Sequence, residues 1–149
     1  MWGDRLAEFH ILEHQVLFRE CDATGDAHVS SYFKWFEDAR FGIAEDAKIM
    51  CLDELKENDI LIPVVSSDCR FYAPLKAKTL IQIHTTLALE ADVRMKFHHV
   101  VVEKETNLQV AEGNTQVVVI SKEDKKIQFL GENVKNRIKK YILNYKEVD

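Results

Sequence analysis

The sequence predicts an α+β fold in which one long central helix is wrapped by a curved antiparallel β-sheet. Two observations carry this prediction. Apolar residues, many of them aromatic, recur at helical spacing over residues 30–47, and four later segments between residues 64 and 121 are rich in Val, Ile, Thr and Phe. The 149 residues show no repeat or linker, so they suit a single domain, residues 1–149, that buries roughly two-thirds of its unfolded surface.

The first element is expected to be a strand over His14–Cys21, because polar and apolar residues alternate there. A turn over residues 22–28 leads into the long helix. That helix should begin near Ser30 or Ser31, since serine is a favourable N-cap residue.

The long helix has a broad apolar stripe. The residues expected on it are Tyr32, Trp35, Phe36, Ala39, Ile43 and Ala47. Phe33 and Phe41 lie off this stripe, so we expect the helix to be buried around much of its circumference.

A short second helix is predicted over residues 52–58, and the pattern then changes to β. The four predicted strands cover residues 64–72, 79–90, 93–104 and 109–121. Their junctions at 90–92 and 105–107 are short enough for hairpins, which predicts an antiparallel meander with the early strand added to it. An amphipathic pattern over residues 132–145 predicts a C-terminal helix.

The composition argues against several classes of protein. With 25 acidic and 20 basic residues the formal charge is −5, which does not favour a nucleic-acid-binding surface. The longest apolar runs, such as residues 117–120, are too short to cross a bilayer, and the amino terminus shows no secretory signal. Three widely spaced cysteines, Cys21, Cys51 and Cys69, suit a reducing compartment, so we expect a cytoplasmic protein.

We expect neither a metal nor a cofactor. The cysteines lack the spacing of zinc ligands, and His98 and His99 are neighbours on a predicted strand, where adjacent side chains point to opposite faces. Cys21 lies beside Asp22 and invites interpretation as a nucleophile, but a buried structural thiol is favoured because free cysteine is usually buried.

The candidate chemistry lies in residues 18–40, where an apolar run breaks into an acidic, glycine-containing turn and then into the aromatic helix. Asp22 places a carboxylate at a predicted strand end, facing the backbone N–H groups of a helix start. A thioester hydrolase needs a group that attacks the carbonyl or activates water, together with donors for the oxyanion. Asp26 either raises the pKa of Asp22 by like-charge repulsion or is a solvated turn residue, and turn chemistry favours the second.

This segment resembles the 4-hydroxybenzoyl-CoA thioesterase branch of the hotdog-fold acyl-CoA thioesterases. In the family pattern a strand ends in an aspartate, small residues and a tyrosine follow, and a Trp-Phe-Glu helix ends in Ala-Arg. The matching positions are Asp22, Ala23, Gly25, Tyr32, Trp35, Phe36, Glu37, Ala39 and Arg40. Residues 68–75 resemble the family strand that ends in an aromatic residue and a proline, and the remaining strands match in length.

The resemblance implies an acyl-CoA substrate and a homodimer with active sites between its subunits, often assembled further into a homotetramer. It implies Asp22 as the catalytic carboxylate, acting either as the nucleophile or as a general base on water. Backbone N–H groups at the helix start would hold the oxyanion, which by position means that of Val29 and its neighbours.

The chain departs from the family pattern beside the turn. Many relatives carry a histidine seven residues after the aspartate, where this chain has Val29, and an asparagine two positions on, where it has Ser31. His28 lies one residue earlier and is either catalytic or a turn histidine. Glu37 follows the family pattern and either lines the site or makes a structural hydrogen bond.

Four residues are candidates for substrate contacts. Ser31 and Tyr32 belong to the helix start, and Tyr32 either shapes an aromatic pocket or belongs to the core, as aromatic residues of buried helices usually do. Arg94 and Lys96 alternate on one face of a predicted strand, where they either meet the phosphates of coenzyme A or form an exposed strand face.

Three alternative functions follow from the same residues. An acyl-carrier-protein thioesterase is a close variant, because the carrier's phosphopantetheine arm would use the same slot. A non-catalytic acyl-CoA-binding hotdog subunit is an alternative from another class. The presence of the family's aspartate as Asp22 disfavours this alternative, whereas the absence of the family's histidine at Val29 is compatible with it. A hotdog enoyl-CoA hydratase fits less well, since Asp26 and His28 lie too close together for the turn of that family.

Overall fold

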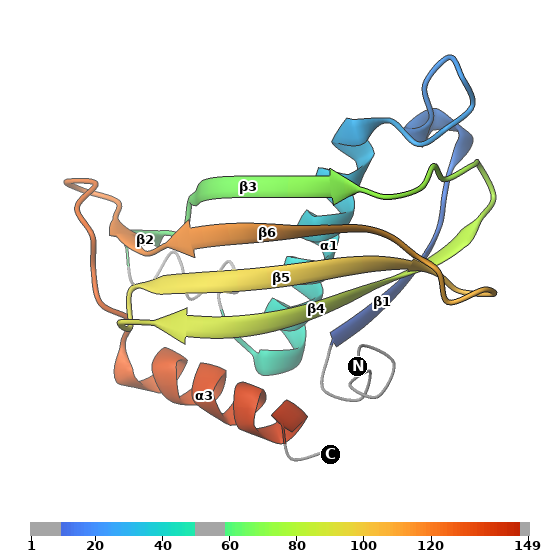
Figure 1. The fold of residues 1–149 in the computed structure, drawn as a ribbon. Helices are drawn as coiled ribbons and strands as arrows, with labels where there is room; N and C mark the ends of the chain where they lie inside the picture. The colour runs from blue at the N-terminus through green and yellow to red at the C-terminus, as the bar shows by residue number, and fades with distance from the viewer. Residues whose placement is uncertain (1–9, 50–58, 147–149) are drawn as a thin grey trace.

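The structure, a computed structural model, describes residues 10–49 and 59–146. A five-stranded antiparallel sheet curves around helix α1 (Val29–Ala47), as Figure 1 shows. The sheet has the strand order β1-β4-β5-β6-β3. The strands are β1 (His10–Gln15), β3 (Val64–Phe71), β4 (Leu80–Glu90), β5 (Arg94–Glu103) and β6 (Gln109–Val118). The predicted α+β fold, a long helix wrapped by an antiparallel sheet, is confirmed.

Helix α1 packs one face onto the sheet. All six residues of the predicted apolar stripe are buried: Tyr32, Trp35, Phe36, Ala39, Ile43 and Ala47. The helix ends at Lys48, which adopts the left-handed conformation with φ of 55° and donates its N–H to the Ala44 carbonyl. Phe33 and Phe41 are 37% and 61% exposed, so the expectation of burial around much of the circumference is wrong for the single subunit. Both rings lie off the stripe that the sheet covers.

Strands β4, β5 and β6 form the predicted meander, with Glu90 opposite Arg94 at the first hairpin. Strand β3 departs from the expected sequential arrangement. It pairs with β6, where Asp68 lies opposite Asn114, and therefore forms the far edge of the sheet. The other edge of β4 is occupied by β1, which places Gln15 opposite Leu80. The chain between β3 and β4 thus crosses from one side of the sheet to the other.

The first strand lies earlier in the chain than predicted. Strand β1 ends at Gln15, and residues Phe18–Glu20 form the 3₁₀ helix η2 instead of continuing the strand to Cys21. The Glu20 N–H donates to the Leu17 carbonyl, and the Glu20 carboxylate accepts the Leu17 N–H, both within one turn. These local bonds compete with strand pairing and turn the chain toward the start of α1.

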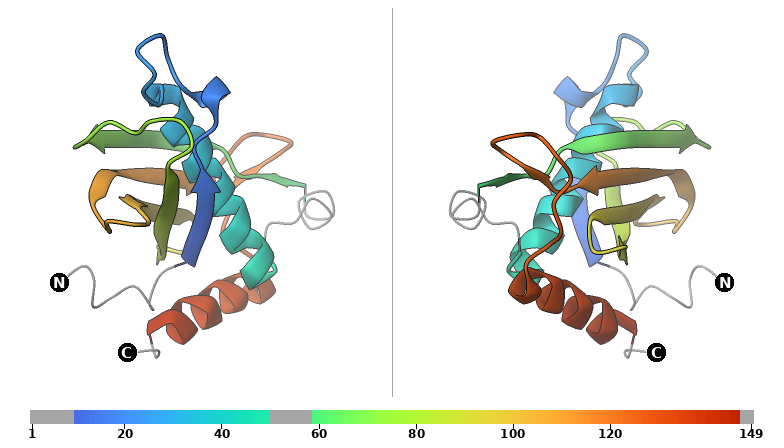
Figure 2. Two further views of the ribbon diagram at one scale, coloured as in Figure 1. Left: turned by 90° about the vertical axis from the view of Figure 1, so that its right-hand side faces the viewer. Right: turned by 90° about the vertical axis from the view of Figure 1, so that its left-hand side faces the viewer.

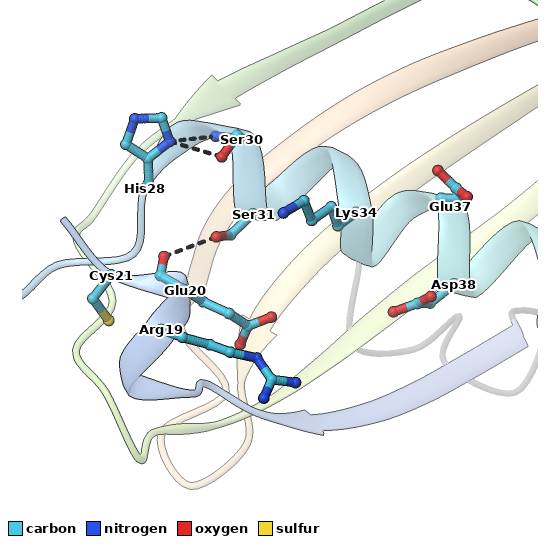
Figure 3. A pocket seen from close by; sticks show the side chains of 9 residues that line it. All are labelled: Arg19, Glu20, Cys21, His28, Ser30, Ser31, Lys34, Glu37 and Asp38. Atoms are coloured by element: carbon cyan, nitrogen blue, oxygen red, sulfur yellow. Dashed lines mark hydrogen bonds between the residues drawn. The ribbon is translucent and has the colours of Figure 1, made fainter.

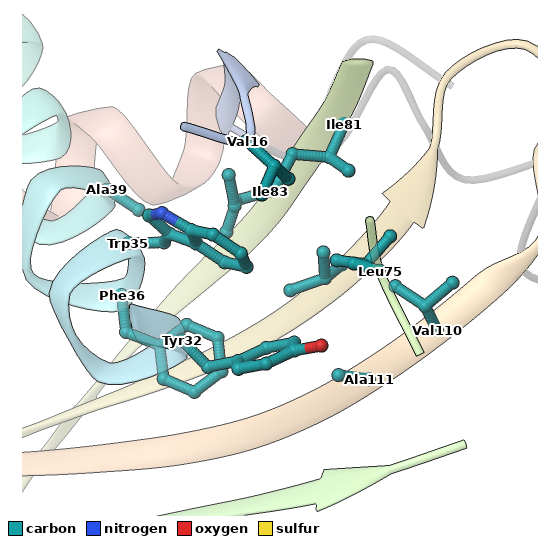
Figure 4. Close-up of a cluster of buried hydrophobic side chains, with 11 residues drawn as sticks. Val16, Tyr32, Trp35, Phe36, Ala39, Leu75, Ile81, Ile83, Val110 and Ala111 are labelled. Carbon is teal, nitrogen blue, oxygen red and sulfur yellow. The ribbon is translucent and has the colours of Figure 1, made fainter. Parts of the chain in front are cut away.

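Two clusters of buried side chains fill the space between α1 and the sheet. The first surrounds the N-terminal half of the helix and is drawn in Figure 4. Its helix residues are Tyr32, Trp35, Phe36 and Ala39. The second surrounds the C-terminal half, where Ile43 and Ala47 meet Met95 and Phe97 of β5 and Ile138 of the last helix.

The predicted C-terminal helix is present as α3 (Glu132–Lys146), which lies across the end of α1 (Figure 2). Two short strands, β2 (Ile60–Leu61) and β7 (Ile120–Ser121), pair with each other beside the main sheet. The helix predicted over residues 52–58 and the thiol of Cys51 lie outside the described residues. Within the described ranges, no helix is both long and apolar enough to cross a membrane.

Candidate active site

The loop between η2 and α1 carries Asp22. Cys21 and Ala27 pair across it as an isolated antiparallel bridge, and the Asp22 N–H donates 2.8 Å to the Asp26 carbonyl. Gly25 supplies the positive φ of 86° that the tight turn requires. The Ala27 N–H donates 2.7 Å to the Leu75 carbonyl and so ties the loop to the chain that precedes β4. The loop therefore holds Asp22 in a defined place on the surface.

The Asp22 carboxylate is exposed and engaged on one oxygen only. Its Oδ1 accepts the Thr24 N–H at 2.8 Å and the Thr24 hydroxyl at 2.5 Å. Among the described residues, none donates a hydrogen bond to Oδ2. The two Thr24 donors lower the pKa of Asp22 against the opposing effect of desolvation, and the Asp26 N–H and nearby His28 add smaller contributions in the same direction. Asp22 is therefore an ionised carboxylate with one oxygen free for a reaction partner.

Asp26 does not act on Asp22 as a repelling charge. Its Oδ1 lies 3.0 Å from the Lys76 ammonium, in an ion pair between the loop and the chain after β3. The direction of the Asp22 pKa shift is downward, which is opposite to the effect of like-charge repulsion. This geometry fits the interpretation of Asp26 as a turn residue.

The start of α1 is capped by His28, not by Ser30 or Ser31 as predicted. The His28 Nδ1 accepts the Ser30 N–H at 3.1 Å and lies 2.8 Å from the Ser30 hydroxyl. In the part of the chain that the structure describes, the Val29 N–H has no hydrogen-bond partner, although it lies at the positive end of a 19-residue helix.

A polar hollow of about 520 Å³ lies between η2 and the first turns of α1 (Figure 3). It is lined by Arg19, Glu20, Cys21, His28, Ser30, Ser31, Lys34, Glu37 and Asp38. Cationic Arg19 and Lys34 thus face the same space as three carboxylates. The side chain of Asp22 does not line this hollow, although that of its neighbour Cys21 does.

Among the predicted substrate contacts, Ser31 and Tyr32 are both buried. The Ser31 hydroxyl donates 2.8 Å to the Glu20 carbonyl. The Tyr32 ring packs edge-on against Phe71 with centroids 4.9 Å apart, and burial raises the pKa of its phenol to about 12. Tyr32 is therefore a core residue in this subunit and does not line the hollow.

Arg94 and Lys96 lie at the opposite end of the sheet from the Asp22 loop, where β5 begins (Figure 1). The Lys96 ammonium pairs with the Glu90 carboxylate at 2.6 Å, and Lys96 lines a separate hollow of about 600 Å³ beside α3. Within one subunit the structure does not bring these two cations to the helix start.

Glu37 lies on the exposed side of α1, where two hollows meet. Besides the helix-start hollow, it lines a mostly apolar one of about 320 Å³ together with Arg40, Phe41 and Ala44 of the helix. Arg40 lies about 16 Å along the helix from Val29, from the rise of 1.5 Å per residue. The two hollows thus follow one side of the helix from its start toward its middle.

The sequence-based reasoning missed Glu20, Arg19 and Lys34. Glu20 was visible only as a residue two positions before Asp22, and its partners come from three separate elements. Lys34 follows the helix start at the i+4 position from Ser30, which places both on one face, and this spacing was the available signal. Metal-binding groups of three or more ligating side chains do not occur among the described residues.

The fold and the family together define a hotdog-fold thioester hydrolase. The family model of the thioesterase-like superfamily matches residues 16–138, and the chain belongs to this superfamily. The resemblance inferred from residues 18–40 is thereby confirmed at the level of the family.

A curated protein and several solved structures are similar to this chain. A curated protein of Aquifex aeolicus (strain VF5), named provisionally as an esterase, is 26% identical over 106 residues, which span 71% of this chain and 80% of its own. Slr0204 of Synechocystis, a 1,4-dihydroxy-2-naphthoyl-CoA thioesterase, has a TM-score of 0.82 at 17% identity, over 87% of this chain and 95% of its own. SAV2348 of Staphylococcus aureus, solved in complex with CoA, has a TM-score of 0.82 at 13% identity, over 91% of this chain and 85% of its own.

Proposed function

We propose that this protein hydrolyses an acyl-CoA thioester to the free acid and coenzyme A, with Asp22 as the catalytic carboxylate and the Val29 N–H as the oxyanion donor. The observation that supports the proposal is that neither assigned group has a hydrogen-bond partner at its reacting atom. The Asp22 Oδ2 accepts no hydrogen bond from the described residues, and the Val29 N–H donates none to them. Membership of the thioesterase-like superfamily supports the reaction class.

In the general-base route, Asp22 Oδ2 takes a proton from water as the water oxygen bonds to the thioester carbonyl carbon. The carbonyl oxygen becomes an oxyanion, which the Val29 N–H and the positive end of α1 stabilise. Collapse of this intermediate breaks the carbon–sulfur bond and releases the CoA thiolate. The thiolate takes up a proton from solvent, to which Asp22 returns the proton that it took from water. In the nucleophilic route the same oxygen bonds to the carbonyl carbon, thiolate leaves, and water then hydrolyses the resulting anhydride.

Two features of the hollows support a CoA ester as the substrate. Arg19 and Lys34 offer cations that suit the phosphates of CoA at the helix-start hollow. The apolar hollow beyond Glu37, lined by Phe41 and Ala44, offers space for the acyl group. The complex of SAV2348 with CoA is consistent with this substrate class. We place the reaction in the cytoplasm, because the widely spaced cysteines suit a reducing compartment.

We also propose that the protein is a homodimer joined along β3. This strand forms an edge of the sheet and, among the described strands, pairs only with β6; its residues are exposed except for half-buried Cys69. A long exposed edge strand presents unpaired backbone groups that a second copy can pair. Phe33 and Phe41 of α1 are also exposed, which supports a second subunit that covers them. A homotetramer built from such dimers remains part of this proposal.

The decisive experiment measures release of free thiol from a panel of aliphatic and aromatic acyl-CoA esters by the parent chain and by Asp22→Asn. We expect the variant to lose about 100-fold or more of kcat, the usual contribution of a general base. Asp26→Asn is the matched control, because it removes one carboxylate from the same loop and should keep a rate within about threefold of the parent.

Two results would overturn the proposal. Asp22→Asn with parental activity would remove Asp22 from the mechanism. A parent chain that cleaves none of the CoA esters but cleaves acyl-carrier-protein thioesters would replace the substrate, and one that cleaves neither would favour a binding subunit. Light scattering during gel filtration gives the subunit number, and the mass of one subunit would contradict the dimer.

A further inference from the structure

Glu20 connects three elements through its carboxylate. The Glu20 Oε1 accepts the Leu17 N–H and the His14 Nε2–H, each at 2.8 Å. The Oε2 accepts the indole N–H of Trp35, also at 2.8 Å. The side chain of Glu20 is only 14% exposed, so water does not readily replace these donors. The carboxylate thus binds β1, η2 and α1 to one another.

The backbone of Glu20 reaches the helix start at two points. Its carbonyl accepts the His28 N–H and the Ser31 hydroxyl, each at 2.8 Å, and the second of these bonds is drawn in Figure 3. His28 and Ser31 flank Val29, whose N–H has no partner among the described residues. One peptide carbonyl therefore holds both sides of the residue that we assign as the oxyanion donor.

The charge of Glu20 is maintained by its surroundings. Partial burial raises the pKa of Glu20, but the hydrogen bonds from His14, Leu17 and Trp35 together outweigh burial and lower it. The group is therefore ionised at neutral pH. Hydrogen bonds to an ionised acceptor are shorter and stronger than bonds between neutral groups. The anchor is consequently stiff at the point where the chain leaves it for Asp22.

We infer that Glu20 is a positioning residue for thioester hydrolysis: its carboxylate fixes the segment that carries Asp22 against the first turn of α1. This inference rests on the proposed function. The arrangement sets the separation between the Asp22 carboxylate and the Val29 N–H, which must act on the same carbonyl group. Glu20 itself does not touch the reacting atoms.

Glu20→Gln is the direct test, because it keeps the size of the side chain and removes its charge. The carboxylate accepts hydrogen bonds on two oxygens, but the amide has only one oxygen and an NH₂ group. In one orientation the NH₂ group faces the Trp35 N–H and that bond is lost; in the other it faces Leu17 and His14 and those bonds are lost. A displacement of about 1 Å in the catalytic geometry costs on the order of 100-fold in rate, so we expect kcat to fall by about 10- to 100-fold. KM should stay within about twofold, because Arg19 and Lys34, the cations that we assign to the CoA phosphates, are unchanged.

Asp46→Asn is the matched control. Asp46 lies on α1 and its carboxylate pairs with His10 of β1 at 3.4 Å, so this variant also removes a carboxylate that meets a histidine of β1, but near the other end of that strand. We expect parental kcat and KM for it. Amide hydrogen exchange provides a readout that does not depend on activity. The His28 amide should exchange about tenfold faster in Glu20→Gln than in the parent, and at the parental rate in Asp46→Asn.

Each outcome decides the inference. Parental kcat in Glu20→Gln, or an equal loss of kcat in Asp46→Asn, overturns the positioning role while the proposed function stands. An unchanged His28 exchange rate overturns the anchor itself, whatever the activity. If Glu20→Gln does not fold, His14→Leu removes one donor to the Glu20 carboxylate from a residue that does not line the helix-start hollow. A rate loss of about threefold or more then supports the inference and parental kcat overturns it. A parent chain without thioesterase activity contradicts both the inference and the proposed function.

Discussion

The imidazole of His99 lies parallel to the ring of Phe36, with centroids 4.3 Å apart and an angle of 5° between the planes. The histidine is fully buried in the middle of the sheet. Its two nitrogens meet the hydroxyls of Thr85 at 2.9 Å and Thr115 at 3.2 Å. The contact thus combines aromatic stacking against α1 with a row of hydrogen bonds across β4, β5 and β6.

This environment predicts a pH dependence of stability. Burial, with smaller contributions from Arg40 and His98, lowers the pKa of His99 from 6.5 to about 3. The unfolded chain therefore binds a proton between these values that the folded chain does not. The stabilisation that comes from neutral His99 is complete above pH 6.5. Between pH 6.5 and about 3 the free energy of unfolding falls as the pH decreases, and this residue accounts for at most about 1.4 kcal/mol per pH unit.

The measurement is urea unfolding of the parent and of His99→Gln between about pH 6.5 and pH 5, where carboxylates stay ionised. Glutamine keeps a hydrogen-bonding group between the two threonines but does not titrate in this range. We expect a steeper pH dependence in the parent than in the variant. His10 and His84, whose pKa values burial also lowers, affect both proteins alike. Parallel curves for the two proteins would show that His99 is not kept neutral.

The hydroxyl of Thr24 is expected to set the acid limb of the rate profile. Because Thr24 lowers the pKa of Asp22, the ionised and active form persists to lower pH than for an isolated aspartate. Removal of the hydroxyl in Thr24→Val should move the acid limb of kcat/KM to higher pH, and Thr24→Ser should restore it. The profile is measured with one CoA ester across the acid range. Coincident pH profiles of kcat/KM for Thr24→Val and the parent would contradict the assignment of Asp22 as the titrating base.

Substitution of His28 separates capping from catalysis. His28→Ala removes the acceptor for the Ser30 N–H and should cost about 1 kcal/mol of unfolding free energy, the usual value for an N-cap. Asparagine is a good N-cap, so His28→Asn should restore the stability. If His28 only caps the helix, kcat of His28→Asn stays within about threefold of the parent. A loss of about 100-fold with parental stability would instead assign an acid–base role to the imidazole.

Gly113 is expected to tolerate no larger side chain. A Cβ at this position of β6 would lie 2.6 Å from Phe36 Cε2 and would also collide with the Asp68 carbonyl of β3. Gly113→Ala should therefore cost about 1–3 kcal/mol of unfolding free energy by overpacking. Gln116→Ala places an alanine in the same strand and serves as the control. Equal midpoints in urea for Gly113→Ala and the parent would show that β3 or Phe36 moves freely.

Local periodicity was sufficient to predict much of this protein. The apolar stripe of α1, the three meander strands and α3 each lie where the pattern placed them, because burial imposes a regular spacing of apolar residues along one element. The family resemblance was also readable, since Asp22, Gly25 and the Trp-Phe-Glu helix are contiguous in the chain. The end of β1 was not, because the alternation through His14–Cys21 is the pattern of a strand, whereas the Glu20–Leu17 bonds that form η2 leave no periodic signal.

The sequence by itself determined the elements, the class of fold and the segment that holds the candidate site. Only the tertiary structure decided that β3 crosses to the far edge beside β6, that Tyr32 belongs to the core, and that Arg94 and Lys96 lie away from the helix start within one subunit. It alone revealed the partners of Glu20, since His14, His28 and Trp35 lie on different elements. Local patterns record how each residue is buried, whereas strand order and side-chain partners depend on contacts between distant segments, which form only when the chain folds.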